Sequence, residues 1–376
     1  MLLFCVAKPS GALEYIHVCQ YSKSTSKAFF NVANLYDHDI LTATEILEKI
    51  MKVMLEKTLS TGEKLRILRF VTPEEIPERV IRYWIASFGF DTYRKAVFSL
   101  TYWRLYFREV FAGNFAKETV DHIYIAEVNG EYAARMWFAY SKKTRHGNFG
   151  HVYTEPAFRK RGLMSELLKI CIADFEASPA EMICCASGNE GAVRAYVNSG
   201  FELIYGGTRG PLALLKKGKF EELTSRYFEK GNAPCIIREG TIGDQFECDK
   251  VLAYCRNVYS GKRNFRRGIA RFIPDFCTAY QEMLSGNGKV FVAENAQGAI
   301  VGYAYALNFN ENGVFDFTWN GDYSSEIPAL LRKTADSVDF PAVLTLDPAD
   351  IEKCELARKS GMTDAVPGNE YLTFRK

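Results

Sequence analysis

The stretch from residue 151 to 168 constrains the fold of this chain more than any other. Its first residues alternate as in a strand, a turn with Arg159, Lys160 and Arg161 follows, and a helical pattern starts at Gly162. The N–H groups of a first helical turn have no intrahelical partners, and together with the helix dipole they favour binding of an anion. A glycine has no side chain, so it lets the anion approach the backbone closely. The stretch therefore predicts a strand, a turn and a helix, whose basic turn either binds a pyrophosphate or is a solvated surface.

The flanking sequence predicts alternating strands and helices. Apolar or alternating runs predict strands at 65–70, 123–127, 132–140, 150–154 and 182–186. Amphipathic patterns predict two helices within 73–111 and one each at 162–177 and 191–199. Asn129-Gly130 is typical of a tight hairpin turn, and Gly200 ends the last helix before a strand that begins at Phe201.

The first 63 residues predict a small unit of their own. Short strands are predicted at 2–7, 13–19 and 28–35, and a helix follows from Thr42. The apolar stripe of this helix consists of Ile46, Ile50, Val53 and Met54. The polar residues 60–64 predict a linker, which puts a domain boundary between residues 63 and 64.

From about residue 233 the chain repeats the order of the central segment. Glu294 ends an apolar run 167 residues after Glu127 ends a similar one, and Gly361 follows a helical pattern 161 residues after Gly200 does. Two similar offsets in the same order predict a duplicated domain. We therefore expect three segments, 1–63, 64–231 and 232–376.

A second motif lies about thirty residues beyond the basic turn. It reads Asn-x-x-Ala-x-x-x-Tyr-x-x-x-Gly-Phe, formed by Asn189, Ala192, Tyr196, Gly200 and Phe201. Together the two stretches resemble the GCN5-related N-acetyltransferase (GNAT) family, whose cofactor loop reads Gln/Arg-x-x-Gly-x-Gly/Ala. Arg159 and Gly162 match that loop, and Met164 departs from it.

This resemblance implies a mixed α/β (α+β) fold with two tandem acyl-CoA N-acyltransferase domains, each a mixed central sheet flanked by helices, and a small N-terminal extension. It also implies acetyl-CoA as co-substrate, bound where two parallel strands separate, and no metal. Backbone groups of Val152 and Thr154 would hold the acetyl carbonyl and the pantetheine arm. The pyrophosphate would be bound at Arg159, Lys160, Arg161, Gly162, Leu163, Met164 and Ser165. Asn189 would bond the pantetheine or a bridging water, and Tyr196 would protonate the departing thiolate.

A general base is not evident from the sequence. In the family a carboxylate often lies about four residues before the carbonyl-holding position, and Asn148 stands there. Strand alternation puts His151 and Tyr153 on the opposite face, and Glu155 falls in the turn. Glu127 on the neighbouring strand is a further candidate. We expect a base acting through water, or none.

The third segment lacks the chemical residues of the second. Alignment on Gly361 places Asp350 where Asn189 stands and Ala357 where Tyr196 stands. Residues 319–331 contain acids and Pro328 in place of the basic turn, and negative charge repels a pyrophosphate. We expect a degenerate copy. Its basic stretch 261–271 is either a solvated loop or a contact for an acidic substrate or RNA.

Composition narrows the partners and the compartment. Lys plus Arg number 47 against 45 Asp plus Glu, so we expect neither nucleic acid nor an anionic membrane as partner. No apolar run is long enough to span a bilayer, and the start of the chain has no signal-peptide pattern, so we expect a cytoplasmic protein. The ten cysteines contain no C-x-x-C pair and predict buried thiols.

The sequence thus predicts an acetyl-CoA-dependent N-acetyltransferase with a small-molecule or peptide amine as acceptor. Two alternatives remain: a non-catalytic acyl-CoA-binding or sensing module, and an aminoacyl-tRNA-dependent transferase built from paired domains of this kind. The sequence determines neither the identity of the acceptor nor the oligomeric state.

Overall fold

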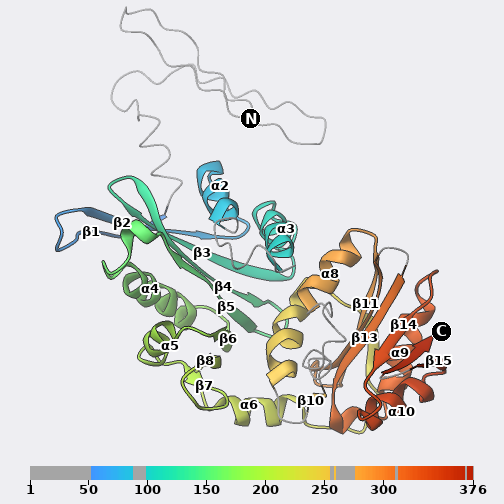
Figure 1. Cartoon of the computed structure of the whole chain (residues 1–376). Helices are drawn as coiled ribbons and strands as arrows, with labels where there is room; N and C mark the ends of the chain where they lie inside the picture. The colour runs from blue at the N-terminus through green and yellow to red at the C-terminus, as the bar shows by residue number, and fades with distance from the viewer. Residues whose placement is uncertain are drawn as a thin grey trace, which may run out of the picture. The chain divides into compact units, whose positions relative to one another are not determined.

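The computed structural model describes residues 52–87, 99–254, 258–259, 276–309, 312–368 and 371–375 (Figure 1). The strands predicted within 2–35 and the basic stretch 261–271 lie outside these residues. The chain divides into two units, Met1–Lys49 and Ile50–Lys376, and everything described below belongs to the second.

The first half of this unit is built on an eight-stranded sheet in the order β1-β2-β3-β4-β5-β6-β8-β7. The strands are β1 (Lys52–Thr58), β2 (Lys64–Val71), β3 (Thr119–Val128), β4 (Glu131–Ser141), β5 (His146–Thr154), β6 (Met182–Ser187), β7 (Glu202–Leu203) and β8 (Gly210–Leu215). Every pairing is antiparallel except that of β5 with β6. The predicted central strands are confirmed, and β5 is longer than predicted.

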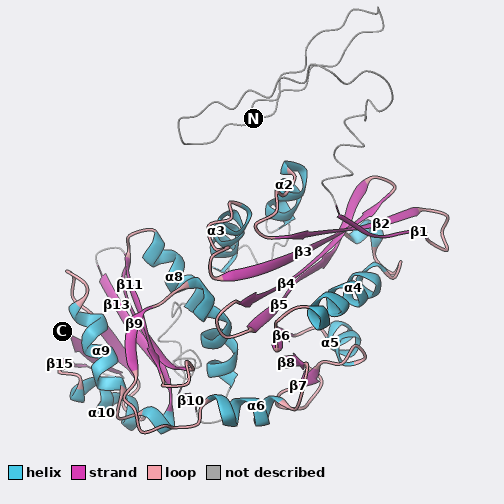
Figure 2. Ribbon diagram, turned by 180° about the vertical axis from the view of Figure 1, so that it is seen from behind, coloured by secondary structure: helices cyan, strands magenta, loops and turns pink. Residues whose placement is uncertain are grey.

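Helices cover both faces of this sheet (Figures 1 and 2). They are α2 (Glu78–Ser87), α3 (Ser99–Phe111), α4 (Leu163–Ala177), α5 (Glu190–Val197) and α6 (Phe220–Tyr227). Trp84 and Phe107 of α2 and α3 pack with Trp137 on one face of the sheet. Leu167 of α4 and Tyr196 of α5 pack with Phe138 on the other. The two helices predicted within 73–111 are thereby confirmed.

The hairpin between β3 and β4 forms at the predicted turn. Asn129 has φ of 49° and Gly130 has φ of 84°. A two-residue turn with positive φ at both positions matches the right-handed twist of the strands it joins. Asn129 further accepts a hydrogen bond from the Lys64 amide at 2.9 Å, which ties the turn to β2.

Two expectations for the N-terminal extension are wrong. Val53 and Met54, whose spacing predicts a helix, lie in β1, which pairs antiparallel with β2. Residues 60–64 are not a linker, because they form the turn of this hairpin, where the Leu59 amide donates to the Glu63 carbonyl at 2.8 Å. Most β1 side chains are exposed, so the backbone ladder forms this strand and leaves no alternating pattern.

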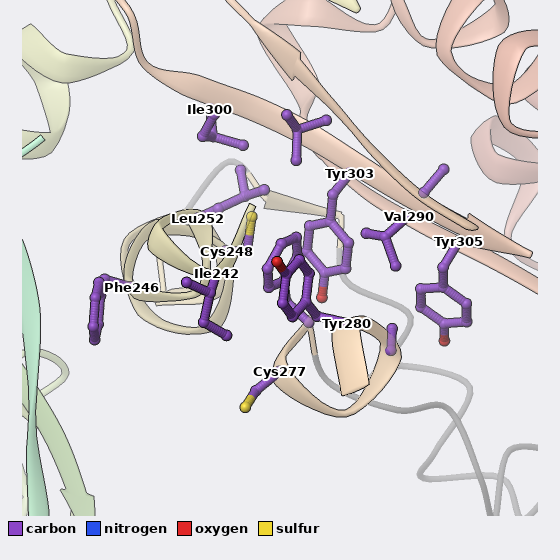
Figure 3. Close-up of a cluster of buried hydrophobic side chains, with 14 of the residues drawn as sticks. Ile242, Phe246, Cys248, Leu252, Cys277, Tyr280, Val290, Ile300, Tyr303 and Tyr305 are labelled. Atoms are coloured by element: carbon purple, nitrogen blue, oxygen red, sulfur yellow. The ribbon is translucent and has the colours of Figure 1, made fainter. Parts of the chain in front are cut away.

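The second half contains two smaller sheets, ordered β10-β13-β12-β11-β9 and β14-β16-β15. Their strands are β9 (Ile236–Glu239), β10 (Val258–Tyr259), β11 (Gly288–Glu294), β12 (Ile300–Phe309), β13 (Asn312–Asn320), β14 (Val343–Leu346), β15 (Thr363–Gly368) and β16 (Tyr371–Arg375). The helices are α8 (Phe276–Leu284), α9 (Ile327–Asp336), α10 (Ile351–Lys359) and the π-helix η4 (Glu247–Leu252). Figure 3 shows side chains of η4 and α8 meeting those of β11 and β12 in a buried core.

The two halves share an order of elements and one structural detail. In the first half the β3–β4 pairing shifts register between Ala126 and Glu127. In the second half the β11–β12 pairing shifts between Ala293 and Glu294, at the offset found in the sequence. The halves differ further on, because β5 and β6 pair whereas β13 and β14 belong to different sheets.

Polar contacts join the two halves. Lys143, in the turn after β4, pairs with Glu294 of β11 at 2.6 Å. His146 Nδ1 lies 3.4 Å from Glu247 Oε1 of η4, and both side chains are buried. Burial raises the pKa of Glu247 despite its hydrogen bonds to His146 and Thr144. The start of β5 is therefore packed against the second half of the chain.

Candidate active site

The parallel strands β5 and β6 separate after a short paired region. Only His146, Gly147 and Asn148 of β5 pair with β6, at Met182, Ile183 and Cys184. Beyond these pairs β5 continues to Thr154 and β6 to Ser187 with no pairing between them. Val152 and Thr154 lie in this part of β5, so their backbone groups on that side are not used by β6. The carboxyl ends of the two strands are where parallel sheets bind ligands.

The predicted pyrophosphate loop has a backbone suited to an anion. Lys160 and Gly162 both have left-handed conformations, with φ of 64° and 76°. Gly162 is the N-cap of α4, provides no side-chain cap, and its carbonyl accepts the first helical bond from the Glu166 amide at 3.2 Å. The amides of Leu163, Met164 and Ser165 precede that bond, in the turn where helix N–H groups lack intrahelical partners. Left-handed turns that converge on a helix start form anion-binding concavities.

Two of the three basic side chains of the loop, those of Arg159 and Arg161, are engaged within the protein. Arg159 Nε donates to the Thr154 carbonyl at 3.1 Å. Arg161 pairs with Glu63 of the β1–β2 turn and donates to the Ala157 carbonyl at 2.7 Å. The two arginines thus stabilise the loop, and the backbone amides and the exposed side chain of Lys160 are the groups that could bind an anion.

Met164, the departure from the family pattern, packs against the core on the α4 face. A side chain held there leaves the backbone amides of the first turn accessible to a ligand, which is all that the loop requires. Leu163 beside it is 1% exposed and belongs to the same core.

The second motif begins directly after β6. Asn189 caps α5, and its Oδ1 accepts a hydrogen bond from the Ala192 amide at 3.1 Å. Tyr196 lies two turns further along, 5% exposed, with its ring centroid 5.2 Å from that of Phe149 on β5. Burial raises the pKa of the Tyr196 phenol, so the group stays protonated at neutral pH. The carboxyl ends of β5 and β6 thus place both motifs at one edge of the sheet.

One prediction about β5 is wrong because the strand contains a β-bulge. The register with β4 passes from the Gly150–Trp137 pair to the Tyr153–Arg135 pair, so two residues of β5 lie opposite one of β4. His151 occupies the extra position with φ of 51°. A bulge reverses strand alternation beyond it. His151 and Tyr153 therefore share the face of Asn148, the face covered by α2 and α3.

Sequence reasoning places His151 on the wrong face because alternation cannot reveal a single inserted residue. A comparison with β13, which follows β12 as β5 follows β4, reveals the inserted residue. In the β12–β13 pairing, Tyr305 lies opposite Asp316 and Tyr303 lies opposite Thr318, with only Phe317 between them. Between these pairs β13 has one residue fewer than β5 has between Gly150 and Tyr153, and it has no bulge in this described region.

Of the other candidate bases, two already have polar partners and the third position holds a neutral amide. Glu127 is 6% exposed and pairs with Arg66 at 3.4 Å. Glu155 accepts a hydrogen bond from the Tyr153 hydroxyl at 3.3 Å. Asn148 is 5% exposed, and its Oδ1 has no hydrogen-bond partner among the described residues. The strand position where the family often has a carboxylate thus holds a neutral amide.

The equivalent region of the second half has a different construction. Lys353 of α10 forms a buried ion pair with Asp316 of β13, with side chains 1% and 4% exposed. Asp350 starts α10 without a side-chain cap, and Ala357 is fully buried. Helix α9 has Pro328 in its first turn, where the N–H that could bind an anion is missing. A buried ion pair thus joins the strand and helix that correspond to β5 and α5.

Metal ligands and membrane spans are not found in the part of the chain that the structure describes. Within it, no group of three or more His, Cys, Asp or Glu side chains is arranged to hold a metal ion. Nor does any helix there have the length and apolar character needed to cross a bilayer.

The family comparison agrees with the loop and the motif. A model of the acetyltransferase (GNAT) family matches residues 81–201. No curated protein matches the chain.

Similar solved structures include a phosphinothricin acetyltransferase from Sinorhizobium meliloti in complex with AcCoA, at 14% identity over 38% of this chain and 88% of that chain, with a TM-score of 0.27. A ribosomal L7/L12 α-N-protein acetyltransferase in complex with coenzyme A matches at 13% identity over 44% and 98%, with a TM-score of 0.30. A ribosomal-protein-S5-alanine acetyltransferase from Vibrio fischeri matches at 10% identity over 39% and 94%, with a TM-score of 0.27. Residues 81–201 thus match the GNAT acetyltransferase family.

Proposed function

We propose that this chain is an acetyl-CoA-dependent N-acetyltransferase that acetylates a primary amine by direct attack in a ternary complex. The observation that supports it most is the convergence of three features where β5 and β6 separate. These are the end of β5 that does not pair with β6, the left-handed loop before α4, and the motif from Asn189 to Phe201, which includes α5.

The residues present suit acetyl-CoA. The amides at the start of α4 would hold the pyrophosphate, with Lys160 and Gly162 shaping the turn. The backbone of Val152 and Thr154 would hold the pantetheine arm and the acetyl carbonyl, the latter polarised by an N–H donor. Tyr196 is protonated at neutral pH and would give a proton to the thiolate, whose usual pKa is about 8.5. Acetyl-CoA itself supplies the activated acyl group.

We further propose that residues 232–376 are a degenerate GNAT-like copy that does not bind acetyl-CoA. The repeated order of elements and the matching register shifts at Glu127 and Glu294 support a duplication. The Lys353–Asp316 ion pair and Pro328 support the loss of the site. This segment would then act through its packing against the start of β5.

Acetyl-CoA-dependent thiol release with a panel of amines tests the function. The panel contains phenethylamine, tyramine, L-lysine and spermidine, so that it includes both aromatic and aliphatic amines. We expect release that depends on both acetyl-CoA and amine. Acetyl-CoA binding without release with any amine would support the sensing module instead. Absence of binding by a folded protein would contradict both.

A further inference from the structure

His151 has a left-handed backbone conformation, and three aromatic rings surround its imidazole. Its φ of 51° is strained for a residue with a Cβ. The ring centroids of Trp103, Phe107 and Trp137 lie 4.4, 4.8 and 5.3 Å from that of the imidazole. Contacts with three rings fix the orientation of the imidazole. A titratable side chain held in a strained backbone is characteristic of functional sites.

The bulge sets this imidazole beside the point where the reaction would occur. His151 precedes Val152, and both lie beyond the last residue of β5 that pairs with β6. The imidazole is on the α2 and α3 face, whereas Tyr196 and the start of α4 are on the opposite face. A co-substrate bound at α4 leaves the α2 and α3 face for the amine.

The other titratable groups on this face are poorer bases. They are Asp121 on β3, Arg135 on β4, Tyr153 on β5, Glu155 after β5, Tyr83 on α2 and Tyr106 on α3. Glu155 already accepts a hydrogen bond from the Tyr153 hydroxyl at 3.3 Å. Burial raises the pKa of Tyr83, Tyr106 and Tyr153, so these phenols stay protonated. Asp121 is 1% exposed and already accepts hydrogen bonds from Trp137 and Thr119, each at 2.9 Å.

The second half provides an internal comparison. The strand that corresponds to β5 has Phe317 where β5 has both His151 and Val152, and its ladder with β12 runs without a shift. The bulge is therefore found in the half that has the anion-binding loop. The corresponding described strand of the other half lacks it, and there a buried ion pair joins that strand to the helix that corresponds to α5.

We propose that His151 is the general base of the reaction and receives the amine on the α2 and α3 face. This inference rests on the proposed function. The imidazole takes one proton from the ammonium of the acceptor, directly or through one water. The freed nitrogen lone pair forms the C–N bond, and the C–S bond breaks with its electron pair going to sulfur. Tyr196 gives its proton to that sulfur and regains one from the new amide nitrogen, and His151 releases its proton to solvent.

The test compares the pH profiles of wild type, His151→Asn and His151→Gly with acetyl-CoA and the amine of the panel that reacts fastest. Asn and Gly both tolerate a positive φ, so the bulge is preserved. We expect wild-type kcat/KM to fall below an ionisation between pH 5 and 8. We expect His151→Asn to lose about 100-fold in kcat and to lose that ionisation. Free imidazole should restore part of the rate of His151→Gly, which a purely structural role would not allow.

His122→Asn is the matched control. His122 is a buried histidine of the same sheet, stacked on Phe138 at 4.3 Å on the opposite face, and burial lowers its pKa to about 4. Its variant should keep the wild-type ionisation.

Three results would overturn the proposal: kcat of His151→Asn within threefold of wild type, no imidazole rescue of His151→Gly, or a wild-type profile with no ionisation in this range. The last result decides the question even if the variants fail to bind acetyl-CoA. A wild-type protein that binds acetyl-CoA and transfers to no amine would contradict the proposed function first, and His151 with it.

Discussion

Tyr196 is the residue to which the mechanism assigns proton donation. We expect Tyr196→Phe to lower kcat by about 100-fold, because the thiolate would leave without an acid. The phenyl ring would still pack between Phe149 and Phe201, so acetyl-CoA affinity should change little. Steady-state kinetics with a parallel thermal shift measures both. Unchanged turnover would remove Tyr196 from the mechanism.

We predict that the buried carboxyl group of Asp121 makes the stability of the folded protein depend on pH. Burial raises the pKa of its carboxyl group from 3.8 to about 6 in the folded protein. Between these values the folded protein binds more protons than the unfolded chain, so the group lowers stability as pH rises through this window. The difference between the two pKa values corresponds to about 3 kcal/mol in the free energy of unfolding.

Urea unfolding at pH 4 to 7 should therefore show Asp121→Asn gaining stability relative to wild type as pH rises, up to about 3 kcal/mol. The amide oxygen can still accept the bond from Trp137. A difference between the two proteins that stays constant across this range would contradict the burial effect.

Residues whose role depends on local motifs are predictable from the sequence. Gly162 and Asn189 are the N-caps of α4 and α5, and Tyr196 lies on the buried face of α5. Each of these positions depends on contacts within a few residues. The face of His151 is not predictable in this way, because it depends on pairing with β4, which is a non-local property.

The loop before α4 is an element that can be tested by a matched pair of glycines. Gly162 and Gly113 have φ of 76° and 75°, and a Cβ added at either would meet no described atom within 4 Å beyond its chain neighbours. An alanine at either position costs about 1–2 kcal/mol of stability by the same strain.

We expect Gly162→Ala to weaken acetyl-CoA binding on the order of tenfold, because relief of the strain shifts the amides of the loop. Gly113→Ala should lose similar stability and keep wild-type affinity. Calorimetric titration of both variants decides this, and equal affinities would mean that the loop does not bind the co-substrate.

Elements with a buried face are predictable, and an element without one is not. Strand β3 buries nearly all of its side chains and helix α4 buries one face, and the sequence predicts α4 near its observed bounds and the central part of β3. Strand β1 is an edge strand with exposed side chains, so its residues carry no period of two, and their spacing predicts a helix instead.

On the scale of the whole molecule, the second half of the chain contacts the start of β5. Glu294 Oε2 forms ion pairs with Lys143 Nζ at 2.6 Å and with Arg238 Nε at 2.8 Å. Burial raises the pKa of Glu294, but these two cations outweigh it and hold the pKa below its ordinary value. Two offsets in the sequence predict the repeat, but no pattern in it predicts the contact of Lys143 with Glu294, because the two residues are 151 positions apart.

Calorimetric titration of the full chain with acetyl-CoA tests the central claim most directly, because it counts sites. We expect one acetyl-CoA per chain, bound at the loop before α4, because we propose that the Lys353–Asp316 ion pair and Pro328 leave no second site. Two sites per chain would contradict the degenerate copy, and no binding by the folded protein would contradict the acetyltransferase itself.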